Sequence, residues 1–231
     1  MELGRAFAAF DGVDSPITQC FGLGVLHPLD AESLGAVERF FFDRGAAADL
    51  EVSPLVGAAA LRLLCDRGYR PIETSSVMYQ DVHVPAGEDS TGVRARLISR
   101  DDAALWAEVC VEGWVQEMPN VRELLAGMAN VIATKQGSAC FLGELDGVPG
   151  ASGSLFLDEG AALFTGAATI PRMRRRGLQT ALLRERMRYA ASQGCDLAVM
   201  VTEPGSTSQK NAERQGFRIA YTRMKWRRER L

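Results

Sequence analysis

The chain has 231 residues, of which 47% are hydrophobic and 24% are charged, and its formal net charge is −3. This length allows one large domain or two small ones, and the composition lies in the range of ordinary globular proteins. The small negative charge argues against broad, non-specific binding of nucleic acids, so any basic cluster must act locally.

Cysteine and histidine usage indicates neither a disulfide framework nor a metal centre. The five cysteines are widely separated and form no CxxC or Cys/His pattern. We therefore expect buried free thiols in a reducing compartment and no metal. The start of the chain lacks the order of a signal peptide, and no apolar run approaches the roughly 18 residues of a membrane span. These features predict a cytoplasmic protein without membrane or nucleic-acid partners.

The clearest pattern in the first half of the chain is that of a helix. Asp30 can cap this helix, which reaches Arg44 and ends at Gly45. The segment 81–92 is polar and carries Pro85, Gly87 and Gly92, which is typical of a linker. The sequence thus predicts an N-terminal unit at 1–80, a linker at 81–92 and a larger unit at 93–231.

The second half has the alternating strand and helix patterns of an α/β fold. In chain order we expect a strand at Val93–Ser99, a helix from Arg100 through Trp106 to Trp114, a helix from Asn120 to about Thr134, a hairpin of Cys140–Glu144 and Ala151–Leu157 around Asp146-Gly147, a strand at Ala161–Ile170, a helix to about Gln193, a strand at Leu197–Thr202, a helix at Thr207–Arg214, and strands at Phe217–Tyr221 and Met224–Trp226. Both tryptophans of the first helix are expected in the core. The charged tail 225–230 is expected to be an edge strand with a solvated end.

The two halves repeat part of this order. A helix ends at Gly45 in the first half and at Gly194 in the second, and each glycine is followed by a short apolar strand. The next helix ends at Gly68 in one half and at Gly216 in the other. The spacing therefore predicts an internal repeat.

The segment Arg174–Ala181 lies between the expected strand 161–170 and the following helix, and it combines three arginines with Gly177. The N-terminus of a helix presents unpaired N–H groups and partial positive charge, which favour phosphate binding. The spacing fits neither a P-loop nor a dinucleotide-binding turn. It predicts another kind of pyrophosphate site. At the related place in the first half, 27–32, acidic residues would repel phosphates.

These residues resemble the GNAT superfamily of acyl-CoA-dependent N-acyltransferases. The fingerprint Arg/Gln-x-x-Gly-x-Gly/Ala is matched by Arg174 and Gly177, and Gly216-Phe217 matches a later mark of the family. Gln179 stands where the family usually has Gly or Ala. The resemblance implies an α/β fold with a mixed central sheet, splayed fourth and fifth strands and flanking helices. The first half is similar to a degenerate GNAT-like partial repeat without the cofactor loop.

The resemblance also implies acetyl-CoA as the acyl donor. Its pantetheine arm would pair with Ala168, Thr169 and Ile170, and a backbone N–H near Ala168 would stabilise the oxyanion. The side chain of Asn211 would add a bond to the pantetheine or to a strand-end carbonyl. The pyrophosphate would be bound by Arg174, Arg175, Arg176, Gly177, Leu178, Gln179, Thr180 and Ala181.

The catalytic groups are less well marked. Many family members place a tyrosine, the acid for the leaving thiolate, where this chain has Ala212. Ser208 and Asn211 are alternative donors on the same helix. Glu203 follows the strand 197–202 at its carboxyl end and is the candidate base. Glu112 and Glu117 are candidates for attracting a cationic acceptor.

We therefore expect an N-acetyltransferase that acts on a primary amine of a small molecule or peptide through a ternary complex. A non-catalytic acyl-CoA binder of the same fold and transfer to a hydroxyl are the alternatives. The acceptor is not specified by the sequence, and a homodimer is left open.

Overall fold

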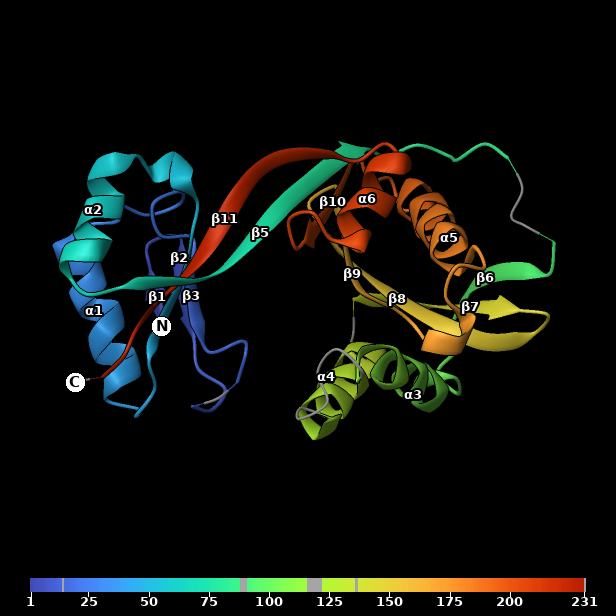
Figure 1. Cartoon of the computed structure of the whole chain (residues 1–231), viewed down its shortest axis with the longest axis horizontal. Coiled ribbons are helices and arrows are strands. Elements are labelled where there is room, and N and C mark those ends of the chain that lie inside the picture. Colours follow the sequence, from blue (N-terminus) through green and yellow to red (C-terminus); the bar gives the residue numbers. More distant parts are fainter. Residues whose placement is uncertain (14, 88–90, 116–121, 136, 231) are drawn as a thin grey trace. The chain divides into compact units, whose positions relative to one another are not determined.

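A computed structural model describes residues 1–13, 15–87, 91–115, 122–135 and 137–230 (Figure 1). The strands are β1 (Glu2–Leu3), β2 (Ala6–Ala9), β3 (Gln19–Phe21), β4 (Ala48–Val52), β5 (Arg70–Asp81), β6 (Val93–Leu97), β7 (Ser138–Leu145), β8 (Val148–Asp158), β9 (Ala161–Thr169), β10 (Leu197–Thr202) and β11 (Arg218–Arg228). The helices are α1 (Ala31–Phe42), α2 (Ala58–Asp66), α3 (Ala103–Trp114), α4 (Arg122–Thr134), α5 (Leu178–Ser192) and α6 (Thr207–Arg214), with 3₁₀ turns η1 (Pro54–Val56) and η3 (Pro171–Met173).

The chain forms two compact units that do not follow the predicted boundaries at 80 and 93. Unit 1 contains 1–77, 202–206 and 219–231, and unit 2 contains 78–201 and 207–218. Strand β5 contributes 70–77 to unit 1 and 78–81 to unit 2, while most of β11 belongs to unit 1. The predicted linker joins β5 to β6 inside unit 2. Composition could not reveal that the last strand belongs to the first unit.

Strand β11 corrects two predictions. Phe217–Tyr221 and Met224–Trp226 were expected as separate strands, but 218–228 is one strand. It is not an edge strand, because it lies between β4 and β5 and pairs antiparallel with β4 from Met224↔Val52 to Arg228↔Ala48. Arg227 donates Nε and Nη2 to the two carboxylate oxygens of Asp49, both at 2.8 Å. The residues that follow the strand, Glu229 and Arg230, are exposed, in agreement with the expected solvated end.

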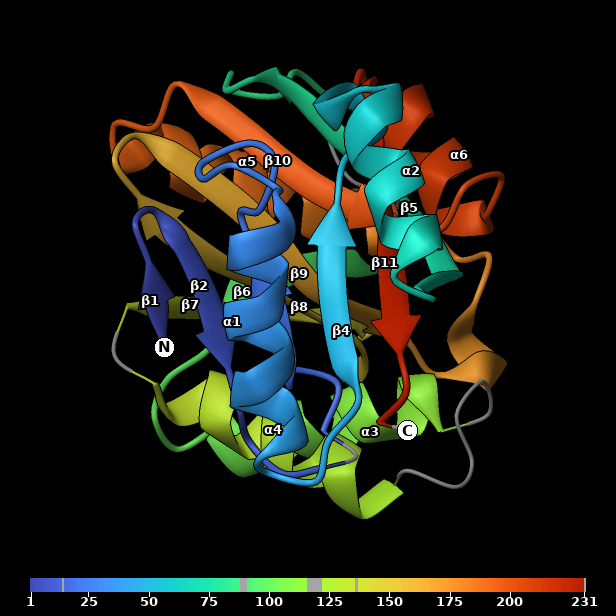
Figure 2. The same ribbon diagram turned by 90° about the vertical axis from the view of Figure 1, so that its left-hand side faces the viewer.

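Unit 1 is built around the order β3-α1-β4-α2-β5. Strand β3 runs parallel to β4 through Cys20↔Leu50, and β1 and β2 extend the sheet antiparallel beside β3. Helix α1 lies across the strands of this unit (Figure 2). Its buried residues Leu34, Val37 and Phe41 form a core with Leu50 and Trp226.

The second half of the chain contains the order β9-α5-β10-α6-β11 expected from the repeat, which confirms the repeat in its element order. The helix-ending glycines match as well: Gly45 and Gly68 have φ values of 75° and 83°, and Gly194 and Gly216 have 74° and 98°. These positive values suit glycine at the residue after a helix.

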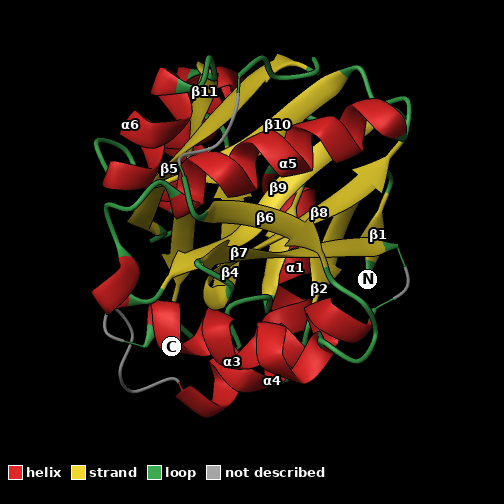
Figure 3. Cartoon of the chain, turned by 90° about the vertical axis from the view of Figure 1, so that its right-hand side faces the viewer, coloured by secondary structure: helices red, strands yellow, loops and turns green. Residues whose placement is uncertain are grey.

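The sheet of unit 2 has the order β10-β9-β8-β7-β6, in which β9 and β10 are parallel and the other pairs are antiparallel. Helix α5 covers one face, and α3 and α4 cover the other (Figure 3). The predicted hairpin is confirmed, because Leu145 pairs with Val148 across Asp146-Gly147. Both turn residues have positive φ, 51° and 78°, as a two-residue type I′ turn requires.

The five cysteines are free, and four of them, Cys20, Cys110, Cys140 and Cys195, are buried as predicted. Burial raises the pKa of Cys20 to about 12 and that of Cys140 to about 11, so these thiols stay protonated near neutral pH. Cys65 is exposed, contrary to the expectation. It occupies the penultimate position of α2, where the helix faces solvent. Among the described helices none is long and apolar enough to cross a membrane.

Candidate functional site

Strands β9 and β10 diverge within unit 2, as the fold prediction required. Their parallel ladder runs from Ala161↔Leu197 to Phe164↔Met200, whereas β9 continues to Thr169. On its other side β9 is bulged against β8, because the register shifts between Ser152 and Ser154. Gly166, with φ of 58°, lies in this bulge. The end of β9 therefore carries backbone that is not part of the ladder to β10.

The orientation of this strand end follows from one hydrogen bond. The N–H of Ile170 donates to the carbonyl oxygen of Gly150 at 2.9 Å, so Ile170 faces β8. Successive residues of a strand direct their backbone groups to opposite neighbours. Ala168 therefore also faces β8, where it is opposite Ser152 in the register, and Thr169 faces away from β8. Of the predicted trio, Thr169 is the residue whose N–H points toward the diverging side.

The turn after β9 brings the predicted arginines to the N-terminus of α5. Arg172, Arg174, Arg175 and Arg176 are exposed, and Arg175 has a φ of 63°. Gly177 precedes the helix in the left-handed region, and within the described part of the chain no side chain caps α5 there. Leu178 and Ala181 are 1% exposed and anchor the first turn in the core. The helix therefore begins with uncapped N–H groups beside four cationic side chains.

Arg174 of this turn and Gln179 in the first turn of α5 form hydrogen bonds to the end of β9. Arg174 donates Nε to the carbonyl oxygen of Thr169 at 3.1 Å and Nη2 to that of Gly113 at 3.2 Å. Gln179 donates Nε2 to the Thr169 hydroxyl at 2.6 Å. The departure of Gln179 from the small residue of the fingerprint thus has a structural role, since its amide joins the helix start to the strand end.

The corresponding helix start in unit 1 is already occupied. Asp30 accepts the N–H of Ser33 at 2.8 Å and caps α1. The backbone and side-chain hydrogen bonds with Ser33 lower the pKa of Asp30. Its carboxylate thus takes the position at which an anion would bind the helix.

The candidate proton-transfer residues make local contacts. Ser208 is exposed in the first turn of α6, and Asn211 accepts a hydrogen bond from Arg214 Nη1 at 3.0 Å. Ala212 is 1% exposed and packs in the core. Glu203 is exposed, groups with unit 1, and accepts the N–H of Ser206 on its backbone oxygen at 3.2 Å.

Of the two carboxylates predicted to attract the acceptor, the structure describes Glu112 but not Glu117. Glu112 forms an ion pair with Arg172, so α3 and the turn after β9 are linked by charge. Glu117 and the predicted cap Asn120 lie outside the described residues. Trp106 is fully buried, as predicted, and Trp114 is half-buried against the same core.

Two residues near the end of β9, Gly113 and Arg186, were not predicted from the sequence. A Cβ on Gly113 would lie 2.6 Å from Cβ of Ala168 and 3.1 Å from N of Thr169, so α3 contacts this strand end closely. Arg186 of α5 is 1% exposed and donates to backbone carbonyls in the bulge. A glycine inside a helical pattern was the available signal for Gly113. Arg186 gave none, since arginines on α5 are frequent.

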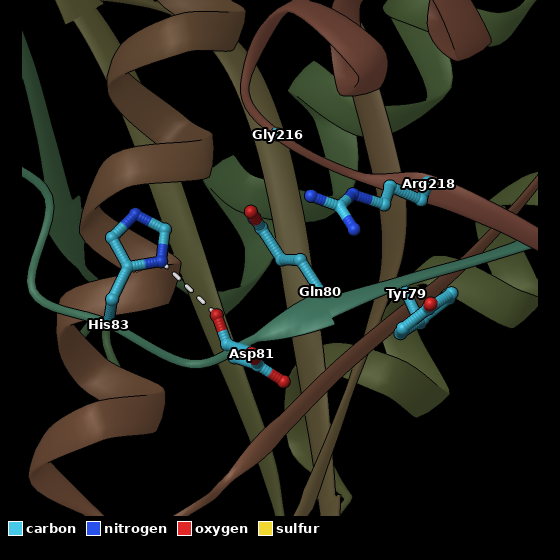
Figure 4. Close-up of a pocket in the computed structure, with 6 residues that line it drawn as sticks. All are labelled: Tyr79, Gln80, Asp81, His83, Gly216 and Arg218. Atoms are coloured by element: carbon cyan, nitrogen blue, oxygen red, sulfur yellow. Dashed lines mark hydrogen bonds between the residues drawn. The ribbon is translucent and has the colours of Figure 1, made fainter.

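A separate hollow in unit 2 does not coincide with this site. Its volume is about 250 Å³, and Tyr79, Gln80, Asp81, His83, Gly216 and Arg218 line it (Figure 4). His83 Nδ1 lies 3.2 Å from the backbone oxygen of Asp81, and Gln80 points toward Gly216. Ligand pockets for molecules of drug size begin at about 300 Å³. The hollow is therefore too small for a nucleotide thioester.

Comparisons with known proteins agree with this geometry. The family model described as "Acetyltransferase (GNAT) family" matches residues 103–217. A search of curated protein sequences gives no match. Among solved structures, a GCN5-related N-acetyltransferase from Kribbella flavida is 16% identical, covers 94% of this chain and 83% of its own, and has a TM-score of 0.68.

Two further structures have the same fold. A GCN5-related N-acetyltransferase from Sphaerobacter thermophilus is 20% identical over 91% of this chain and 72% of its own, with a TM-score of 0.68. A tandem GNAT protein from the clavulanic acid biosynthesis pathway is 17% identical over 91% and 75%, with a TM-score of 0.62. The tandem architecture of that protein agrees with the repeat seen here. Through residues 103–217, this chain belongs to the acetyltransferase (GNAT) family.

Proposed function

We propose that the protein transfers an acetyl group from acetyl-CoA to a primary amine of a small molecule or peptide, within a ternary complex. One observation carries most of the proposal. The uncapped start of α5, with Gly177 in the left-handed region and exposed arginines around it, lies beside the end of β9. Backbone N–H groups and cationic side chains are what a pyrophosphate requires.

The strand end supports the remainder of the donor site. A pantetheine arm would run between the diverging β9 and β10 and pair with backbone at 168–170. Because Ile170 is bonded to β8, the Thr169 N–H is the better donor for the arm or for the oxyanion. Arg174 would act through Thr169 and Gly113 as well as by its charge, and Arg175 and Arg176 would face the phosphates. Asn211 would add a polar contact to the arm.

The proton transfers are assigned to Glu203 and Ser208. Glu203 would accept the proton of the amine, directly or through water, and Ser208 would pass a proton to the leaving thiolate and regain one from solvent. The amine nitrogen would attack the thioester carbonyl, forming the amide bond as the carbon–sulfur bond breaks. A thiol pKa near roughly 8.5 makes CoA a fair leaving group near neutral pH, so we expect the acid to contribute at the lower end of the usual range for general acids.

Turnover tests the proposal. In a panel of amines with acetyl-CoA, free thiol should be released only when a suitable amine is present, and mass spectrometry should identify an N-acetylated product. Saturable CoA binding without thiol release on any amine would support the alternative of a non-catalytic acyl-CoA binder. An O-acetylated product would place the acceptor in the hydroxyl class.

Replacement of Ser208 by alanine should reduce kcat, while KM for acetyl-CoA stays within about twofold. Positioned acids contribute on the order of 100-fold at the lower end, which sets the expected loss. Thr207→Ala is the matched control, because it removes an exposed hydroxyl one residue earlier in α6. Equal kinetics for Ser208→Ala and the wild type would remove Ser208 from the mechanism.

A further inference from the structure

Around the bulge in β9, side chains donate hydrogen bonds to backbone carbonyls of both β9 and β8. A bulge interrupts the regular ladder, and buried backbone groups without partners are costly. Here the donors are Trp106 Nε1 for Gly153 (3.2 Å), Ser152 Oγ for Gly166 (3.3 Å), and Arg186 Nη1 for Ser154 (3.4 Å) and Thr165 (3.3 Å). The donors come from both sides of the sheet, since Trp106 lies on α3 and Arg186 on α5. The irregular backbone is thus held by side chains from α3, β8 and α5.

Among these donors, Arg186 is the charged one, and its burial carries the largest desolvation cost. Its side chain is 1% exposed, and its hydrogen bonds go to backbone oxygens, including that of Leu182 at 3.1 Å. The guanidinium carbon lies 5.0 Å from the ring centroid of Phe164. Nη2 has no hydrogen-bond partner among the described residues. Burial lowers the pKa of Arg186 to about 9, which reflects the cost of keeping this charge from water.

The neighbouring strand is adapted to this guanidinium. A Cβ on Gly153 would lie 3.0 Å from Cζ of Arg186 and 3.1 Å from Nε, tighter than an ordinary contact. Glycine at 153 therefore leaves the room that the guanidinium uses. An apolar residue of similar length at 186 would fill the core without the cost of burying a charge. The arrangement is thus hard to explain as packing alone.

We infer that Arg186 is a positioning residue, whose guanidinium bonds the carbonyls of Ser154 and Thr165 and holds the β9 bulge so that the strand end at Ala168–Thr169 keeps the orientation needed to bind the acyl donor. Thr165 directly precedes Gly166, and three residues later the strand reaches the predicted pantetheine contacts. The role in donor binding rests on the proposed function, whereas the role in holding the bulge does not.

The test compares Arg186→Met with Arg188→Met. The control removes an arginine from the same helix, but Arg188 is 34% exposed and pairs with Glu185 at 3.1 Å. Amide hydrogen exchange of 161–170 is measured on the ligand-free protein, and CoA affinity is measured by calorimetry. Arg186→Met should speed exchange in this segment about tenfold and weaken CoA binding about tenfold, which corresponds to the loss of two backbone hydrogen bonds. Exchange in β7 should stay unchanged, and Arg188→Met should match the wild type.

The outcomes distinguish the role of Arg186 in holding the bulge from the proposed donor site. Wild-type exchange and wild-type affinity in a folded Arg186→Met protein would overturn the inference, as would an equal change in Arg188→Met. Faster exchange in Arg186→Met together with a wild type that binds no CoA would reject the donor site but retain the bulge assignment. Should Arg186→Met not fold, Arg186→Lys keeps the charge but loses the planar fork, and the same shifts in exchange and affinity are expected of it.

Discussion

Valine in place of Gly177 should abolish detectable CoA binding while the protein stays folded. Gly177 has a φ of 84° and turns the chain from the extended Arg174 into α5. A β-branched residue avoids this region, so the turn must rearrange. The N–H groups at the start of α5 would then lose the common direction that a pyrophosphate requires. Isothermal titration with CoA measures the loss directly.

Gly194→Val is the matched control for this variant. Gly194 follows the other end of α5 with a φ of 74°, and a Cβ there meets nothing within 4 Å. Both substitutions therefore impose similar left-handed strain, roughly 1–2 kcal/mol. The control should lower the melting temperature by about as much as Gly177→Val but bind CoA like the wild type. Unchanged affinity in folded Gly177→Val would remove the start of α5 from the donor site.

Much of the fold could be predicted because local signals determined it. Asp146-Gly147 specified a two-residue turn, and the helix-ending glycines marked the repeat in both halves. The paths of β5 and β11 were not predictable in this way. Their placement depends on Trp226 and Arg227 meeting partners about 180 residues away in sequence, such as Asp49. No local sequence pattern indicates which sheet such a strand joins.

For the candidate site, too, the part formed by residues that are adjacent in sequence could be predicted, and the contacts between distant residues could not. The motif around Gly177 was visible because a strand, a glycine turn and a helix follow one another in the chain. The bonds from Arg174 and Gln179 to Thr169 depend on how the turn folds back on the strand. Arg186 could not be distinguished from the other arginines of α5, since a helical pattern does not show which polar residue is buried with partners. The sequence therefore proposes where the site lies, and the contacts indicate which residues would support it.

The second large effect is expected for Gly113→Ala. An alanine Cβ at this position of α3 would lie 2.6 Å from Cβ of Ala168 and 3.1 Å from N of Thr169. Neither partner is the end of a flexible side chain, so helix and strand must separate. The shift would also move the carbonyl of Gly113 that Arg174 Nη2 binds. We expect stability to fall by about 1–3 kcal/mol, as for overpacked cores, and CoA affinity to fall on the order of tenfold through the displaced strand end.

The same substitution in the neighbouring helix should act in the opposite direction. Gly127 of α4 is exposed, and a Cβ there meets nothing within 4 Å. Gly127→Ala should therefore raise the free energy of unfolding by about 0.5–1 kcal/mol, because alanine loses less conformational entropy in a helix. Its CoA affinity should equal that of the wild type. Denaturant unfolding measures the stability of both variants, and isothermal titration measures their affinity for CoA. If Gly113→Ala is as stable and binds CoA as tightly as Gly127→Ala, the close approach of α3 to β9 does not shape the donor site.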